Sequence, residues 1–158
     1  MSKINRRRFL KQSANSGAVA FPFVLTQLGQ AAKTSASERI RVGMVGAAGR
    51  AGKLSSLFAN NPNVEIAAIA EIDPRRLPNT LQGVTKIQGR KPKTTTDFRK
   101  LIDDPKIDAL CIGTPDHWHA IPTILGCLAG KDVYVEKPDS HNIVEGHRMV
   151  QPMRKHKR

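Results

Sequence analysis

The stretch from Ile40 to Pro62, IRVGMVGAAGRAGKLSSLFANNP, restricts the possible folds of this chain more than any other. A β-rich run leads into a glycine-rich turn, and apolar residues then recur at helical spacing at Leu54, Leu57 and Phe58. This order suits a diphosphate, because the turn lets backbone N–H groups approach the anion and the helix N-terminus attracts it. The sequence therefore predicts a βαβ unit with a phosphate-binding turn.

The turn departs from the usual dinucleotide fingerprint, G-x-G-x-x-G. Counted from Gly46, alanine stands at the second and third glycine places, as Ala48 and Ala51. A single Cβ at each place is compatible with a bound dinucleotide, and an ordinary strand-to-helix turn remains the alternative. The candidate cofactor-binding residues of the turn are Gly46, Ala48, Gly49, Arg50 and Ala51.

An acid follows the second predicted strand, over residues 63–70. Glu71 stands at its C-terminal end, close to the spacing at which an acid binds the adenosine ribose. Its charge would repel a 2′-phosphate, which favours NAD, and Asp73 is the nearby alternative ligand. Arg75 and Arg76 come next and leave NADP open. For either acid, a solvated strand end is the other interpretation.

Beyond this unit, strand and helix patterns alternate along the chain. The alternation predicts an α/β fold of the doubly wound type, with a mainly parallel sheet and right-handed crossovers. The polar, turn-rich residues 83–96 predict a loop that leads at best to a short third strand. The further expected elements are a brief helix from Asp97, a buried strand over 107–112, a helix over 119–129, a strand over 133–135 that also looks buried, and a last helix from His141 to about Met153, interrupted by Pro152.

The formal net charge of +13 is unevenly distributed. Residues 1–37 hold Lys and Arg but no acid, and further cations cluster between Arg148 and Arg158, so the body between is only mildly basic. No basic stripe is interleaved with aromatic residues, which argues against a nucleic-acid partner. Cys111 and Cys127 lie in apolar segments and are expected to be small buried hydrophobes rather than a disulfide.

The N-terminal segment is interpreted as a targeting signal. Arg6 and Arg7 are followed, after one variable position, by Phe-Leu-Lys and then by a weakly apolar run interrupted by Ser, Gly and Pro. That run is too short and too polar to span a bilayer as a stable helix. Residues 1–37 resemble a twin-arginine export signal, which implies the export machinery as a partner and a periplasmic location. A disordered basic tail is the alternative.

The run DALCIGTPDHWHAIPTILGCLAGKDVYVEKP, from Asp108 to Pro138, carries a family resemblance. It resembles the nucleotide-binding half of the Gfo/Idh/MocA family, the glucose–fructose oxidoreductase and inositol dehydrogenase family. With the glycine turn, the resemblance extends over about residues 39–150. The matching marks are Thr114-Pro115, His119, Ala129-Gly130-Lys131 and Glu136-Lys137-Pro138.

The resemblance implies a Rossmann-type fold and an oxidoreductase that uses NAD, with NADP left open. It places the catalytic role on Lys137, at a strand end where ligands lie and where an ammonium can polarise a substrate oxygen. Glu136 would orient Lys137, and Pro138 would fix the strand exit, in the family often through a cis bond. A surface lysine at a strand end is the alternative. The implied cofactor-cleft residues are Thr114, Pro115, His119 and Glu136.

Asp116, His117 and His119 could form a metal cluster, but two histidines two residues apart diverge on a helix. No metal is therefore expected. Packing or helix capping is the alternative, non-functional interpretation of His117 and Trp118.

In this family a second α/β domain supplies substrate contacts, and no residue of this chain can be assigned that role. We therefore expect residues 38–150 to form the NAD(P)-binding domain and residues 151–158 to be a basic tail at a point of truncation. The expected function is hydride transfer on a small polyol or sugar-like alcohol or ketone, once a second domain completes the site. The alternative is a catalytically silent dinucleotide-binding module or a degenerate remnant.

Overall fold

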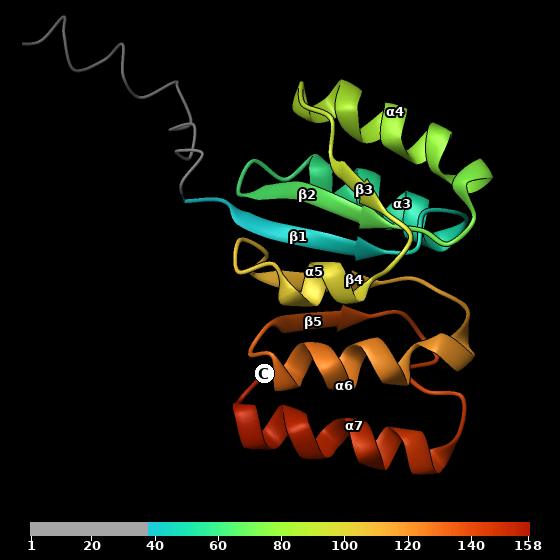
Figure 1. Cartoon of the computed structure of the whole chain (residues 1–158), viewed down its shortest axis with the longest axis vertical. Coiled ribbons are helices and arrows are strands. Elements are labelled where there is room, and N and C mark those ends of the chain that lie inside the picture. Colours follow the sequence, from blue (N-terminus) through green and yellow to red (C-terminus); the bar gives the residue numbers. More distant parts are fainter. Residues whose placement is uncertain (1–37) are drawn as a thin grey trace, which may run out of the picture. The chain divides into compact units, whose positions relative to one another are not determined.

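The computed structural model describes residues 38–158, which form a five-stranded sheet with helices against it (Figure 1). Every strand pair is parallel, and the strand order is β3-β2-β1-β4-β5. This is the order expected when two βαβ halves wind outward in opposite directions from a central strand. The strands are β1 (Ile40–Val45), β2 (Val64–Ala70), β3 (Lys93–Thr95), β4 (Ala109–Ile112) and β5 (Asp132–Val135).

A helix lies between each pair of successive strands, and a last helix follows β5. A short 3₁₀ turn precedes two of them. The helical segments are α3 (Arg50–Ala59), η1 (Pro74–Arg76), α4 (Leu77–Gln88), α5 (Arg99–Asp103), η2 (Asp116–Trp118), α6 (Ala120–Leu128) and α7 (Ile143–His156).

The sheet is covered on both faces, which confirms the doubly wound prediction. One buried apolar cluster joins strand residues to Leu54 of α3 and Val84 of α4. A second cluster joins the opposite strand residues to Leu101 and Ile102 of α5. Over β4 and β5, α6 approaches so closely that a Cβ on Gly126 would lie 2.8 Å from the Leu110 side chain. The two faces therefore have separate cores.

The prediction of a loop over residues 83–96 is wrong for its first part, because α4 continues to Gln88. Apolar residues do recur at helical spacing at Leu77, Leu81 and Val84, but most of them precede the polar residues 83–96 that predicted a loop. Gly89 ends the helix in the left-handed conformation, with φ 69°, and the short third strand follows as expected.

The last helix is also longer than predicted. Pro152 does not interrupt α7, which runs on to His156, so most of the supposed basic tail is helical. Pro152 lies within the helix and is buried, and Asn142 caps the helix start by accepting from the Glu145 N–H. Basic residues in the last turn interact favourably with the negative end of the helix dipole and so stabilise the helix.

The strand before the E-K-P motif is at an edge of the sheet and is not buried as predicted. Its residues alternate between exposed and half-buried, and Tyr134 is 45% exposed. The Lys137–Pro138 bond is cis, as the resemblance implied. Cys111 and Cys127 are buried free thiols, and burial raises the pKa of Cys111 to about 12. Within residues 38–158, no helix combines the length and the apolar character that crossing a membrane requires.

Candidate functional site

The glycine turn is held open by its own backbone and by two neighbouring elements. Gly46 and Gly49 have φ angles of 98° and 57°, which side chains other than glycine rarely adopt. The Gly46 N–H donates to the Ala70 carbonyl at 2.8 Å, and the Thr80 hydroxyl of α4 donates to the Ala47 carbonyl. The turn is therefore pre-shaped before any ligand binds.

Ala51 stands at the third glycine place of the fingerprint, and the space for its side chain comes from a glycine on a neighbouring segment. Ala51 is fully buried, and a Cβ built on Gly113, just beyond β4, would lie 2.9 Å from the Ala51 Cα and Cβ atoms. The close approach of helix and strand that the third glycine usually provides is supplied here by Gly113. The role of Gly113 could not be recognised from local sequence, because this glycine faces the turn from a distant segment.

Glu71 lies against the glycine turn, as its candidate role requires. One carboxylate oxygen accepts from the Ala47 N–H at 2.9 Å, and the other accepts from the Asp73 N–H at 3.0 Å. A carboxylate has about four acceptor positions, so two remain for a hydroxyl pair. Glu71 thus both shapes the turn and keeps the capacity to bind a ribose diol.

Asp73 is occupied by the two arginines that follow it. Its carboxylate accepts from Arg75 Nε and Nη2, both at 2.9 Å, and lies 3.5 Å from Arg76 Nε. The hydrogen bonds from Arg75 hold the pKa of Asp73 below its ordinary value. The single negative charge of Asp73 is therefore shared between two guanidinium groups, and Arg75 is its closer partner.

The segment after β4 brings an unsatisfied hydroxyl to the same edge of the sheet. The Thr114 Oγ1 atom is buried and has no hydrogen-bond partner among the described residues. Pro115, next to it, is the N-cap residue of η2. His119 behaves differently from the prediction of a cleft-lining residue, because it is only 2% exposed and both ring nitrogens contact backbone carbonyl groups.

An ion pair joins the start of α3 to the residues just after β5. Arg50, at the start of α3, donates from Nε to Glu136 Oε1 at 2.9 Å, and the Tyr134 hydroxyl donates to the same oxygen at 3.2 Å. The hydrogen bond from Arg50 lowers the pKa of the buried Glu136. The Lys137 N–H donates to the other oxygen at 3.3 Å. The Lys137 side chain is exposed and makes no ion pair with the described residues.

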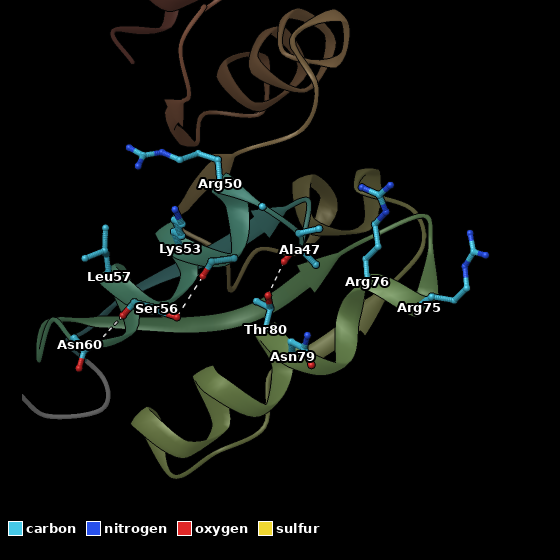
Figure 2. A pocket seen from close by; sticks show the side chains of 13 residues that line it. Ala47, Arg50, Lys53, Ser56, Leu57, Asn60, Arg75, Arg76, Asn79 and Thr80 are labelled. Carbon is cyan, nitrogen blue, oxygen red and sulfur yellow. Dashed lines mark hydrogen bonds between the residues drawn. The ribbon is translucent and has the colours of Figure 1, made fainter.

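A pocket of about 690 Å³ lies beside the turn (Figure 2). Arg50 and Lys53 project from α3 on one side of it, and Arg76 projects from the segment before α4 on the other. No carboxylate lines this pocket. Its residues are Ala47, Ala48, Gly49, Arg50, Gly52, Lys53, Ser56, Leu57, Asn60, Arg75, Arg76, Asn79 and Thr80. A cationic lining beside exposed backbone N–H groups suits phosphate.

The Asp116 carboxylate lies 3.6 Å from His117 and 3.4 Å from His141. Hydrogen bonding to His141 lowers the pKa of Asp116. Within residues 38–158, no set of three His, Cys, Asp or Glu side chains could hold a metal ion.

These residues fit a nicotinamide dinucleotide. Gly46, Ala48 and Gly49 would face its diphosphate, and Glu71 would bind the adenosine ribose. The buried Thr114 hydroxyl still lacks a partner and is positioned to supply or accept a hydrogen bond. The bound cofactor would supply hydride chemistry, and Lys137 would supply a proton-donating cation.

Comparison with known proteins bears on the family, the fold and the cofactor class. The family model "Oxidoreductase family, NAD-binding Rossmann fold" matches residues 40–158. A glycosyl hydrolase family 109 protein of Shewanella pealeana is 30% identical over 154 residues, which are 86% of this chain and 34% of that protein. Inositol 2-dehydrogenase of Rubrobacter xylanophilus is 36% identical over 104 residues, which are 65% of this chain and 28% of that one.

A solved structure of levoglucosan dehydrogenase in complex with NADH is similar, with a TM-score of 0.63 and 27% identity. The match covers 73% of this chain and 32% of that one. The chain spans about a third of the length of the curated relatives that it matches. The parallel sheet, the glycine turn and the match over residues 40–158 together show that the chain belongs to the Gfo/Idh/MocA oxidoreductase family, whose Rossmann domain binds NAD.

Proposed function

We propose that residues 38–158 bind NAD(H) at the carboxyl edge of the sheet and present Lys137 for hydride transfer on a sugar-like alcohol or ketone. The observation that carries the proposal is Glu71, whose carboxylate is fixed on the glycine turn by the Ala47 N–H and retains acceptor capacity for a ribose diol. The Asp73 carboxylate, which engages Arg75 and Arg76 and would repel a 2′-phosphate, favours NAD over NADP.

The substrate class rests on the relatives. One similar protein is named as an inositol dehydrogenase and another as a levoglucosan dehydrogenase, and both names denote polyhydroxylated substrates. Substrate contacts would come from a second domain, as the family resemblance implies. Within this chain, Lys137 is the residue proposed to touch the reacting oxygen, and Glu136 positions it through the Lys137 backbone N–H.

We expect the purified chain to bind NADH more tightly than NADPH, and Glu71→Ala to weaken NADH binding about tenfold or more. The substitution removes a ribose acceptor and leaves the Ala47 N–H unpaired, and a hydrogen bond to a charged group is worth about 1.5–3 kcal/mol. Isothermal titration calorimetry with both nucleotides measures this.

Lys137→Ala is the control variant for Glu71→Ala, since the exposed Lys137 ammonium is assigned to substrate and not to cofactor. Its NADH affinity should stay within about twofold of the unsubstituted chain, because no described contact of the turn depends on it. Absence of binding heat with NADH and NADPH in the unsubstituted chain would refute the proposed function.

We further propose that the chain is exported in folded form by the twin-arginine route to the periplasm. The support is the Arg6-Arg7 pair followed by Phe-Leu-Lys, which lies outside the described residues. In a bacterium with that route, the chain should appear in the periplasmic fraction, and Arg6→Lys with Arg7→Lys should retain it in the cytoplasm. An unchanged distribution of the double variant would contradict this proposal.

A further inference from the structure

Arg50 connects the glycine turn to the segment that carries Lys137. It is the first residue of α3 and directly follows Gly49, and its Nε atom donates to Glu136 Oε1 at 2.9 Å. The turn follows β1 and Glu136 follows β5, and β4 lies between these two strands in the sheet. The bond therefore crosses the carboxyl edge of the sheet beside β4. A dinucleotide that extends from Glu71 to Lys137 must cross the same part of this edge.

Arg50 uses only part of its donor capacity in this bond. A guanidinium group carries five N–H donors in a planar fork, and Nε alone donates to Glu136. The Arg50 side chain is 57% exposed and lines the pocket beside the turn. Its terminal nitrogens can therefore reach a ligand while Nε stays on the carboxylate.

Glu136 joins Arg50 to two further groups. Its Oε1 atom also accepts from the Tyr134 hydroxyl at 3.2 Å, and its Oε2 atom accepts from the Lys137 N–H at 3.3 Å. Glu136 is only 5% exposed, and a buried carboxylate depends on such partners because water cannot replace them. A change in how Arg50 is held must therefore affect both Tyr134 and the Lys137 peptide.

We propose that Arg50 binds the diphosphate of the dinucleotide through its terminal nitrogens while Glu136 positions it through Nε, and that this bridge links occupancy of the glycine turn to the segment of Lys137. An arginine suits this role, because its fork can serve a carboxylate and a phosphate together, whereas a lysine is a single point charge. The inference rests on the proposed function, since it requires a dinucleotide at the turn.

ADP tests the binding role, because it carries the adenosine and the diphosphate but lacks the nicotinamide nucleoside. Its affinity is measured from amide shifts of the turn in the ¹⁵N-labelled chain. Arg50→Gln should weaken ADP binding about tenfold, since a charge-assisted contact is lost. Arg50→Lys should weaken it about fivefold, because one ammonium group cannot serve both acceptors.

Arg99→Gln is the matched control for Arg50→Gln. Arg99 is the first residue of α5, and its Nε atom donates to the Asp97 carboxylate at 2.8 Å, as Arg50 donates to Glu136. Arg99 does not line the described pocket. The control changes the net charge equally, so it should bind ADP within about twofold of the unsubstituted chain.

Tyr134 reports the link from the turn to β5. It is the single tyrosine of the chain, so a ¹³C label in tyrosine rings gives the signals of this residue alone. Saturating ADP should shift them in the unsubstituted chain and in Arg99→Gln, but not in Arg50→Gln or Arg50→Lys. The rival route is the Phe58 ring of α3, whose centroid lies 5.7 Å from that of Tyr134. A shift that persists in Arg50→Gln would overturn the link through Arg50.

The affinities separate this inference from the proposed function. If NADH and ADP bind Arg50→Gln as tightly as the unsubstituted chain, Arg50 does not bind the diphosphate, while the proposed function stands. If the unsubstituted chain binds neither nucleotide, the proposed function fails and the inference fails with it. Full ADP affinity and an unchanged Tyr134 shift in Arg50→Lys would show that charge alone suffices, and would overturn the bridge.

Discussion

Replacing Gly113 with alanine is expected to lower the free energy of unfolding by about 1–3 kcal/mol, the usual cost of overpacking a close contact. The added Cβ would lie 2.9 Å from the Ala51 Cα and Cβ atoms and 3.1 Å from its backbone nitrogen. Two of these three atoms belong to the backbone of α3, so no side-chain rotation can relieve the contact. Urea denaturation followed by circular dichroism measures the change.

A compensating substitution identifies the cause. Ala51→Gly in the same chain removes one of the crowded atoms, so Gly113→Ala should cost less in that background than in the original one. Gly83→Ala is the control of opposite sign, because Gly83 lies within α4 and its Cβ would meet only Ser56 Oγ, at 4.0 Å. It should stabilise the chain by about 0.5–1 kcal/mol. Equal costs of Gly113→Ala in both backgrounds would rule out Ala51 as the obstacle.

Asp73→Asn is expected to shift nucleotide preference toward NADPH by about tenfold to a hundredfold. Asp73 binds Arg75 and Arg76, and both arginines line the pocket beside the glycine turn. Removing its charge frees two guanidinium groups for a 2′-phosphate, and charge-assisted hydrogen bonds are worth about 1.5–3 kcal/mol. An asparagine oxygen can still accept from the Arg75 N–H, so the turn before α4 keeps its cap. The ratio of NADPH to NADH dissociation constants is the measurement.

The chain offers a close control for this substitution. Asp97 accepts from the Arg99 N–H at 3.0 Å and from Arg99 Nε at 2.8 Å, the same arrangement that joins Asp73 to Arg75. Asp97 does not line the described pocket. Asp97→Asn should therefore leave the NADPH to NADH ratio unchanged. If both variants shift the ratio equally, net charge and not the pocket arginines determines the preference.

Strand positions were the most predictable part of the fold. The run 40–45 was predicted as it stands, because the β-branched residues Ile40, Val42 and Val45 lead directly into a glycine turn. The helix α4 was missed in part, because its last turn lies in the polar residues 83–96 while its apolar residues Leu77 and Leu81 come before them. The exposure of β5 could not be foreseen either, because an edge strand can carry the same residue types as a central one.

The candidate site was predictable for those residues whose role follows from their spacing in the sequence. The turn glycines and Glu71 follow from local spacing, and the structure brings them together. Gly113 escaped attention because its function depends on Ala51 across the sheet edge, a contact between segments 62 residues apart that no local pattern encodes. The burial of His119 was hidden for the same reason, as its acceptors come from two different loops.

The bond between Arg50 and Glu136 joins residues 86 positions apart, one in the first crossover and one just past the final strand. Contacts of such long sequence separation form late, because the intervening chain must be ordered before they gain anything. The glycine turn can thus form from residues of the first crossover, whereas the Arg50–Glu136 ion pair forms only after β5 has joined the sheet. A nucleotide that contacts segments from both halves of the sheet would bind only the assembled domain, so NADH should stabilise that state by mass action.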